Sequence, residues 1–214
     1  MSRDKKNICV VGGAGHAGLP LSLAFASAGQ HVIIYDLNAT AMDDIRKGTM
    51  PFVEHGAEPL LKQALQENRL TFTTDPNEIE RAEHVIVAIG TPVDEYLNPK
   101  LRALLDLFSE LRPHLRPSQT IVIRSTVFPG TCRHVERFLG DKDGQWKIAY
   151  CPERIAQGFA IRELSELPQI VSGCSPEAVE SATQLFALLA PEIIRVKIEE
   201  AELAKLFTNA WRYI

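Results

Sequence analysis

The amino-acid sequence predicts a doubly wound α/β protein, in which a mainly parallel sheet carries helices on both faces. Short apolar runs rich in β-branched residues recur along its 214 residues and alternate with helix-like segments, which is the order of elements in such a fold. The runs are apolar throughout rather than alternately polar, as expected for strands buried on both faces. A glycine-rich turn follows the first run and opens the first helix.

Eight runs are predicted to be strands, at residues 8–12, 31–36, 70–74, 84–90, 120–125, 146–151, 169–173 and 192–196. Helices are predicted between them, at residues 17–29, 38–48, 57–68, 100–111, 131–139 and 176–189. The last stretch, "IEEAELAKLFTNAWRYI", begins a strong helix near residue 199 that has large apolar side chains in its last turn and no cap. We therefore expect this helix to continue beyond the chain or to pack against a further region.

The composition is that of an ordinary globular protein, with 45% apolar and 23% charged residues. A formal net charge of −4 indicates no surface for nucleic acid or an anionic membrane. No apolar stretch approaches the ~20 residues that cross a bilayer, and the first apolar run is too short for a signal peptide. The four cysteines lack metal-ligand or disulfide spacing, so we expect no metal site and a reducing, cytoplasmic location.

Three glycines follow the first predicted strand in "NICVVGGAGHAGLP", at Gly13, Gly15 and Gly18. This spacing between a strand and a helix is typical of a Rossmann-type dinucleotide site. The first glycine allows a tight turn, the second lets a pyrophosphate approach the backbone, and the third lets the helix pack closely on the strand. The start of the helix, including His16 and Ala17, offers N–H groups to the phosphates.

Asp36 ends the second predicted strand, about 20 residues after the glycines, where a carboxylate accepts hydrogen bonds from the ribose hydroxyls of a dinucleotide. The same carboxylate repels a 2′-phosphate, so the pattern favours NAD over NADP as the cofactor. The alternative interpretation is a glycine-rich turn followed by an unrelated surface aspartate.

Two later strand ends carry polar groups, because Gly90 and Thr91 follow one run and Ser125 and Thr126 follow another. Ligands of open α/β sheets lie beyond the carboxyl ends of the strands, so these residues are candidates to contact the cofactor. The alternative is that their hydroxyls are ordinary helix N-caps.

The sequence resembles the UDP-sugar 6-dehydrogenases of the UDP-glucose/GDP-mannose dehydrogenase family, which oxidise UDP-glucose or UDP-N-acetylmannosamine to uronic acids. The matching segments occur in the family's order along nearly the whole chain: "GGAGHAGLPLSLAFASAGQHV", "GTPVDEYLNPKL", "STVFPGT", "YCPERIAQG" and "EAELAKLFTNAWR". The "CPER" and "TPVDE" segments favour the branch that oxidises N-acetylhexosamines, such as the UDP-N-acetyl-D-mannosamine dehydrogenases.

The resemblance implies a four-electron oxidation that uses two NAD⁺ in succession and passes through a thiohemiacetal on a cysteine outside this chain. By motif match, it assigns Thr126 to the nicotinamide side and to positioning water, and Glu153 to water or proton transfer. It assigns Lys205 and Asn209 to the developing oxyanion, with Lys205 also a candidate base for the first oxidation.

The spacing of the last helix is compatible with these roles, because Glu202, Lys205, Asn209 and Arg212 are three and four residues apart and share one face. An ammonium and a carboxamide one turn apart make a suitable donor pair for an alkoxide. The alternative is an ordinary solvated, charged helix face. Leu203, Phe207, Ala210 and Ile214 fall on another face, which is apolar.

By motif position, Arg154 and Ile155 are candidates to contact the sugar. Three residues depart from the family pattern: Cys151 stands where relatives have asparagine, Gln157 where the glucose branch has a second glutamate, and Ala41 where many relatives have a basic residue. Cys151 has no histidine or lysine near it in sequence to lower its pKa, so we interpret it as a buried structural thiol. For Glu153, the alternative is a carboxylate in an ordinary turn.

The resemblance divides the chain into an NAD-binding Rossmann domain at residues 1–198 and the start of a connecting helix at residues 199–214. The family's second domain, which holds the uridine diphosphate, and its nucleophilic cysteine are absent from these 214 residues. We therefore expect the chain to bind NAD without completing catalysis. The expected partners are a UDP-sugar and, in the full-length protein, a second copy in a homodimer, and the expected process is polysaccharide biosynthesis.

Two other interpretations stay open on sequence alone. A relative of the β-hydroxyacid dehydrogenases also pairs a Rossmann domain with a helix carrying lysine and asparagine four residues apart, but performs a single hydride transfer and needs no cysteine. A free-standing dinucleotide sensor is the third interpretation, against which the uncapped last helix argues.

Overall fold

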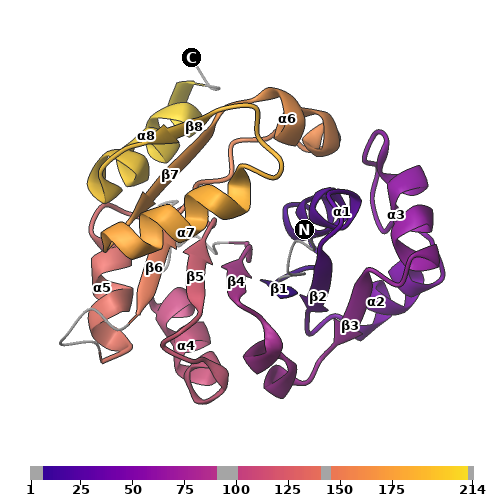
Figure 1. Ribbon diagram of the computed structural model, residues 1–214, viewed down its shortest axis with the longest axis horizontal. Helices are drawn as coiled ribbons and strands as arrows, with labels where there is room; N and C mark the ends of the chain where they lie inside the picture. Colours follow the sequence, from indigo (N-terminus) through magenta and orange to yellow (C-terminus); the bar gives the residue numbers. More distant parts are fainter. Residues whose placement is uncertain (1–6, 91–100, 141–145, 212–214) are drawn as a thin grey trace, which may run out of the picture.

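The computed structural model describes residues 7–90, 101–140 and 146–211 and confirms the doubly wound α/β fold (Figure 1). Its eight-stranded sheet has the order β3-β2-β1-β4-β5-β6-β7-β8. The strands are β1 Asn7–Val11, β2 His31–Tyr35, β3 Leu70–Thr73, β4 His84–Val87, β5 Thr120–Ile123, β6 Lys147–Tyr150, β7 Gln169–Gly173 and β8 Ile193–Arg195. All neighbours pair in parallel except β6 and β7, which are antiparallel. Each predicted strand is present.

The helices are α1 Gly18–Ser27, α2 Ala39–Arg46, α3 Ala57–Gln66, α4 Leu101–Leu111, α5 Thr131–Phe138, α6 Ala160–Glu166, α7 Pro176–Phe186 and α8 Ile198–Trp211, with 3₁₀ turns η1 Pro76–Arg81 and η2 Arg112–His114. The six predicted helices and the last helix are present, while α6 was not predicted. Helix α6 has seven residues, and its N-cap position is Phe159, which has no side-chain oxygen to mark a helix start.

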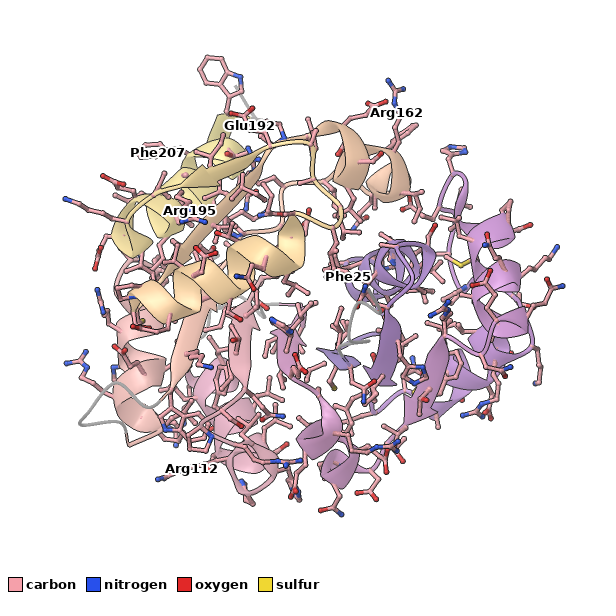
Figure 2. The ribbon with its side chains drawn as sticks, in the orientation of Figure 1. Phe25, Arg112, Arg162, Glu192, Arg195 and Phe207 are labelled. Carbon is pink, nitrogen blue, oxygen red and sulfur yellow. The ribbon has the colours of Figure 1, made fainter. Side chains whose placement is uncertain are left out.

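Alternate residues of each strand face opposite layers of helices, so the molecule has a core on each side of the sheet. Ile8 and Val10 of β1 belong to the core under α1, α2, α3, α6 and α7. Cys9 and Val11 belong to the core under η1, α4, α5 and α8. Phe25 of α1, labelled in Figure 2, packs on Phe186 of α7 with ring centroids 5.9 Å apart in the first core.

The sheet has its topological switch point at β1, which pairs with β2 on one side and with β4 on the other. The chain runs outward from β1 to β3 and then returns to start again at β4. Helix α1, after β1, covers the first core and α4, after β4, covers the second. Open α/β sheets bind ligands beyond the carboxyl ends of the strands at such a point.

Helix α8 lies against the sheet through a buried polar contact. Glu202 has no exposed surface, and its carboxylate accepts hydrogen bonds from the N–H groups of Gly130 at 2.6 Å and Cys132 at 2.9 Å. These N–H groups begin α5, whose N-cap Gly130 has no side chain to satisfy them. The outer side of α8 is apolar and exposed, with Phe207 pointing away from the body of the molecule (Figure 2).

We predict that Glu202→Gln lowers the free energy of unfolding by about 2 kcal/mol, because the neutral amide makes weaker hydrogen bonds to the start of α5. Urea unfolding followed by circular dichroism measures this change. Glu199→Gln is the matched control on the same helix: Glu199 is half-exposed and forms a surface ion pair with Arg133, so its loss is expected to cost below about 0.5 kcal/mol. Equal effects of the two substitutions would contradict the capping role of Glu202.

Candidate functional site

The turn after β1 is held against the end of β2 by two main-chain bonds. The N–H groups of Gly12 and Gly13 both donate to the Tyr35 carbonyl, at 2.9 and 3.3 Å. Gly12 has a φ of 79°, so the left-handed residue of the turn is Gly12 rather than Gly13, to which the sequence pattern gave this role. The doubled glycine in "VVGGAG" is the signal that could have identified it.

Gly13 and Gly18 are required by close packing. A Cβ atom at Gly13 would lie 2.8 Å from the Val10 carbonyl oxygen and 2.9 Å from a methyl group of Ile34. A Cβ atom at Gly18 would lie 2.8 Å from the Cα atom of Gly13 and still closer to the carbonyl oxygen of the turn. These approaches let α1 start directly on β1, as the pattern predicts for its third glycine.

Gly15 has a different environment, because a Cβ atom there would meet the Gly12 carbonyl oxygen at 3.3 Å and no other described atom within 4 Å beyond its chain neighbours. This single contact with a backbone oxygen is tight, but packing at Gly15 is looser than at Gly13 or Gly18. The sequence pattern assigns Gly15 to the close approach of a pyrophosphate, and this assignment stays a prediction.

The N-terminus of α1 is open to an anion. Its N-cap is Ala17, whose methyl group cannot accept a hydrogen bond from the first-turn N–H groups. The Leu19 N–H donates to the Gly15 carbonyl at 2.9 Å and Pro20 has no N–H, so the helix dipole and the N–H groups before Leu19 give this end its partial positive charge, which favours a phosphate. His16, beside Ala17, is exposed, and its ring stacks on Phe52 with centroids 4.1 Å apart and an angle of 18° between the rings. Phe52 has no signal in the sequence that would place it at this site.

Asp36 follows β2 and is tied to the glycine turn. Its carboxylate accepts hydrogen bonds from the N–H of Ala14 at 3.0 Å and from the N–H of Asn38 at 2.9 Å, one to each oxygen. Each carboxylate oxygen can accept a further bond, so the oriented carboxylate has capacity for the two hydroxyls of a ribose. The contact with the turn shows that Asp36 is not an isolated surface aspartate, and its assignment to the ribose stays a prediction.

The strand ends next to β1 bring further candidates to the same edge. Gly90 is exposed beyond β4, while Thr91 lies outside the described residues. Beyond β5, the Ser125 hydroxyl donates to the Ile89 carbonyl at 2.8 Å and ties the two strand ends together, and Thr126 follows, half-buried. The N-cap of α5 is Gly130, so the alternative that Ser125 or Thr126 caps this helix is wrong.

Glu153 and Lys205, which are far apart in sequence, meet beyond β6. The Glu153 N–H donates to the Arg124 carbonyl at 3.3 Å, which anchors the residue after the strand. The Lys205 ammonium donates to the Glu153 carbonyl and lies 4.0 Å from the Glu153 carboxylate. The Lys205 side chain is only 7% exposed. The structure therefore joins an acid and a cation that the motif match assigned to catalysis.

The alternative that the polar face of α8 is an ordinary solvated face is wrong for Glu202 and Lys205. Glu202 and Lys205 are buried and Asn209, one turn further on, is half-buried. Arg212 lies outside the described residues. The apolar face predicted opposite them is instead exposed, with Leu203 and Phe207 on the surface.

Arg154 and Ile155 are held by contacts within the protein. The Arg154 guanidinium donates to the Pro168 carbonyl, and its half-buried position lowers its pKa through the loss of hydration. The Ile155 N–H donates to the Glu153 carboxylate, and its side chain packs against the first core. The assignment of these two residues to the sugar stays a prediction.

Cys151 is completely buried, which confirms that it is a structural thiol. Burial raises its pKa to about 12, although the nearby Arg124 guanidinium acts in the opposite direction. Burial likewise raises the pKa of Cys9 to about 12 and that of Cys174 to about 12, and it raises that of Cys132 well above its usual range. These thiols are protonated at neutral pH and are poor nucleophiles.

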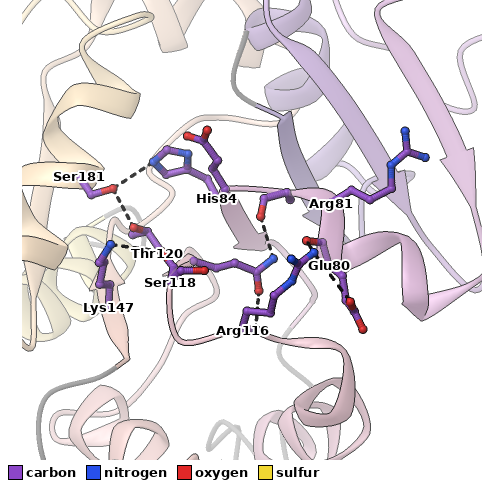
Figure 3. Close-up of a pocket in the computed structure, with 11 residues that line it drawn as sticks. Glu80, Arg81, His84, Arg116, Ser118, Thr120, Lys147 and Ser181 are labelled. Carbon is purple, nitrogen blue, oxygen red and sulfur yellow. Dashed lines mark hydrogen bonds and ion pairs between the residues drawn. The ribbon is translucent and has the colours of Figure 1, made fainter. Parts of the chain in front are cut away.

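A cavity of about 370 Å³ lies at the amino edge of the sheet, where β4, β5 and β6 begin (Figure 3). This edge is opposite to the carboxyl edge that carries the glycine turn. Its cations already have partners: an Arg116 guanidinium nitrogen lies 3.8 Å from the Glu80 carboxylate, and Lys147 donates to a backbone carbonyl at 3.2 Å. On its wall, the Ser181 hydroxyl lies 3.1 Å from the His84 ring nitrogen. Because ligands of this fold bind beyond the carboxyl ends of strands, this cavity is not the dinucleotide site.

The part of the chain that the structure describes contains no cluster of three or more histidine, cysteine or acidic residues able to hold a metal ion. Among the same residues, no helix is both long and apolar enough to cross a membrane.

Comparison with known proteins places the chain among nucleotide-sugar dehydrogenases. Residues 6–190 match the model of the NAD binding domain of the UDP-glucose/GDP-mannose dehydrogenase family. An NDP-N-acetyl-D-galactosaminuronic acid dehydrogenase from Ralstonia nicotianae is 30% identical over 98% of this chain and 52% of its own length. A GDP-mannose 6-dehydrogenase from Pseudomonas putida is 34% identical over 93% of this chain and 48% of its own length.

The structural comparison agrees with the sequence comparison. The solved structure of a UDP-D-ManNAc dehydrogenase from Pyrococcus horikoshii superposes with a TM-score of 0.88 and 27% identity, over 96% of this chain and 50% of that one. The chain spans about half the length of the curated relatives it matches.

The glycine turn generates a prediction that separates folding from binding. Gly18→Ala forces a methyl group into the turn backbone and is expected to lower the free energy of unfolding by more than about 2 kcal/mol. Gly15→Ala is expected to lower the free energy of unfolding by less than about 1 kcal/mol, because only the Gly12 carbonyl oxygen must give way there, while NAD binding falls below detection. Thermal unfolding and calorimetric titration measure the two effects. NAD binding by Gly15→Ala at the affinity of the unchanged protein would contradict the phosphate assignment.

Proposed function

The chain belongs to the UDP-glucose/GDP-mannose dehydrogenase family, whose NAD-binding domain it forms, and from this premise we propose that it serves the 6-oxidation of a nucleotide sugar. The substrate we propose is a UDP-N-acetylhexosamine or UDP-hexose, and the product is the uronic acid. The observation that carries the proposal is the hydrogen bond between Ala14 and Asp36, which joins the phosphate-binding turn to the ribose-binding carboxylate.

The proposed reaction converts the primary alcohol to a carboxylate: one alcohol, one water and two NAD⁺ give one carboxylate, two NADH and three protons. NAD⁺, when bound, supplies the electron acceptor for each oxidation. The nucleophile is a cysteine outside these 214 residues, because burial keeps the thiols described above protonated.

Gly15 and the open start of α1 would hold the pyrophosphate, with His16, Ala17 and Gly18 at the same helix end. Asp36 would accept the ribose hydroxyls and exclude a 2′-phosphate. At the carboxyl edge, Gly90, Thr91 and Thr126 would line the path toward the nicotinamide. These roles are supported by the position of β1 between β2 and β4, because open α/β sheets bind ligands beyond the carboxyl ends of strands at such a point.

Lys205 is suited to stabilise the developing oxyanion in the proposed reaction. Its ammonium is buried and close to the Glu153 carboxylate, so it can stabilise an alkoxide without competition from bulk water. Asn209, one turn further along α8, would supply a second donor, and Glu153 would move a proton to or from water during thioester hydrolysis. Arg154 and Ile155 complete the proposed sugar side.

The choice of sugar rests on the relatives, whose names mention N-acetylgalactosaminuronic acid, GDP-mannose and UDP-ManNAc. The first and third of these names, together with the "CPER" segment, support an N-acetylhexosamine. We further propose a role in polysaccharide biosynthesis, a homodimer in the full-length protein, and a cytoplasmic location consistent with its free cysteines. The family match decides against a β-hydroxyacid dehydrogenase relative.

We predict that Asp36→Ala weakens NAD binding by about tenfold or more, because it removes charge-assisted hydrogen bonds to the ribose. NADP binding is expected to weaken less or to improve, since the repulsion of the 2′-phosphate is lost. Calorimetric titration with both dinucleotides measures the discrimination. Asp44→Ala, an exposed aspartate on α2, is the control and should change neither affinity. Unchanged affinities in Asp36→Ala would refute the ribose assignment.

A second prediction concerns turnover. The 214-residue chain is expected to bind NAD and yet form no NADH when mixed with UDP-sugars, whereas the full-length protein forms two NADH for each sugar oxidised. Absorbance at the NADH band measures both. Turnover by the 214-residue chain would show that the reaction needs no group outside it, and one NADH for each sugar would refute the four-electron reaction.

A further inference from the structure

The segment between α2 and α3, residues 49–56, touches both halves of the candidate site, and we call it the strap. At one end, Phe52 stacks on His16 in the phosphate-binding turn. At the other end, Glu54 and His55 contact the connection between β6 and α6, residues 152–159, which we call the substrate-side loop.

Glu54 is the central contact of the strap. It is only 6% exposed, and its carboxylate accepts hydrogen bonds from the N–H groups of Gly158 at 3.1 Å and Ile161 at 3.3 Å. The His55 N–H donates back to the Gly158 carbonyl at 2.9 Å. A buried carboxylate needs such donors, so moving the loop away would leave a charge without its hydrogen bonds.

The substrate-side loop depends on carboxylates for its shape. The Ile155 N–H donates to Glu153, and the Ala156 N–H donates to Glu163 at 2.6 Å. Both of those acids belong to the loop or to α6 and move with it. Glu54 comes from the other half of the chain, so its bonds fix where the loop lies relative to the phosphate-binding turn.

The other end of the strap contacts the phosphate-binding turn through the stack of Phe52 on His16. His16 lies between Gly15 and Ala17, the residues whose backbone faces the proposed pyrophosphate. A phosphate bound there would lie beside His16, whose ring is nearly parallel to that of Phe52. Phe52 packs against the first core, which limits its own movement.

We propose that the strap couples the cofactor to the substrate-side loop, and that Glu54 is the positioning residue that holds Glu153 in a place set by cofactor binding. Phe52 contacts the phosphate-binding turn through the His16 ring. Two residues later, the Glu54 carboxylate fixes the substrate-side loop by accepting hydrogen bonds from main-chain N–H groups of Gly158 and Ile161. The proposal rests on the proposed function, since it takes the turn as the NAD site and the loop as the substrate side.

Hydrogen–deuterium exchange of the 214-residue chain, with and without saturating NAD, tests the coupling. NAD is expected to slow exchange of the Gly158 and Ile161 amides by about fivefold or more, although neither residue lies in the phosphate-binding turn. A parallel calorimetric titration shows whether NAD binds. Absence of binding would overturn the proposed function and the coupling together, whereas binding without slower exchange would overturn the coupling alone.

Two variants separate positioning from general stability. Glu54→Gln is expected to speed exchange of the two amides about tenfold and to abolish their response to NAD, because its amide makes weaker bonds. Glu58→Gln, an exposed glutamate on α3, is the matched control and should behave like the unchanged protein.

Phe52→Leu keeps the apolar contact and is expected to keep exchange without NAD unchanged while losing the response to NAD. A full response in Phe52→Leu would refute the path through the rings.

Discussion

The close approach of bare backbone at the end of β1 is the constraint on which the rest of the site depends. Helix α1 can start directly on β1 because Gly13 and Gly18 have no side chains between them. That contact places the N-terminus of α1 at the carboxyl edge of the sheet, where β1 lies between β2 and β4. It also brings the turn within reach of the carboxylate that ends β2. The shape of the proposed phosphate site is therefore set by packing.

Buried or half-buried carboxylates hold together segments that are far apart in sequence. Asp36 holds the phosphate-binding turn, Glu54 holds the substrate-side loop, and Glu202 holds the start of α5. Each accepts main-chain N–H groups where a helix or loop begins and lacks its own cap. Such bonds are stronger than those of neutral acceptors, and their directions position the backbone at the carboxyl edge of the sheet.

The strands and the fold class were predictable because their signals are local, namely apolar runs and glycine spacing. The acid at the end of β2 was likewise visible in the sequence, and the structure places it against the glycine turn. Cys151 was predictable as a buried thiol for the same reason. Phe52 and Glu54 were not, because their partners lie across the fold and more than 100 residues away in the case of Glu54. Helical spacing correctly grouped Glu202 with Lys205, but it could not show that this face points inward. Gly12 was missed because the fingerprint counts glycines without their backbone angles.

The reversal of β7 relative to β6 has a consequence for where the chain tolerates changes in length. Because β7 and β8 run against the other strands, α8 returns toward the carboxyl edge and carries Lys205 to Glu153. Two residues, Val196 and Lys197, join β8 to α8. An insertion in the first turns of α8 would rotate Lys205 by about 100° for each added residue. Insertions and deletions should thus be tolerated in the outer loops. They should not be tolerated between Glu202 and Lys205, because the helix turn there sets the positions of two buried charged groups.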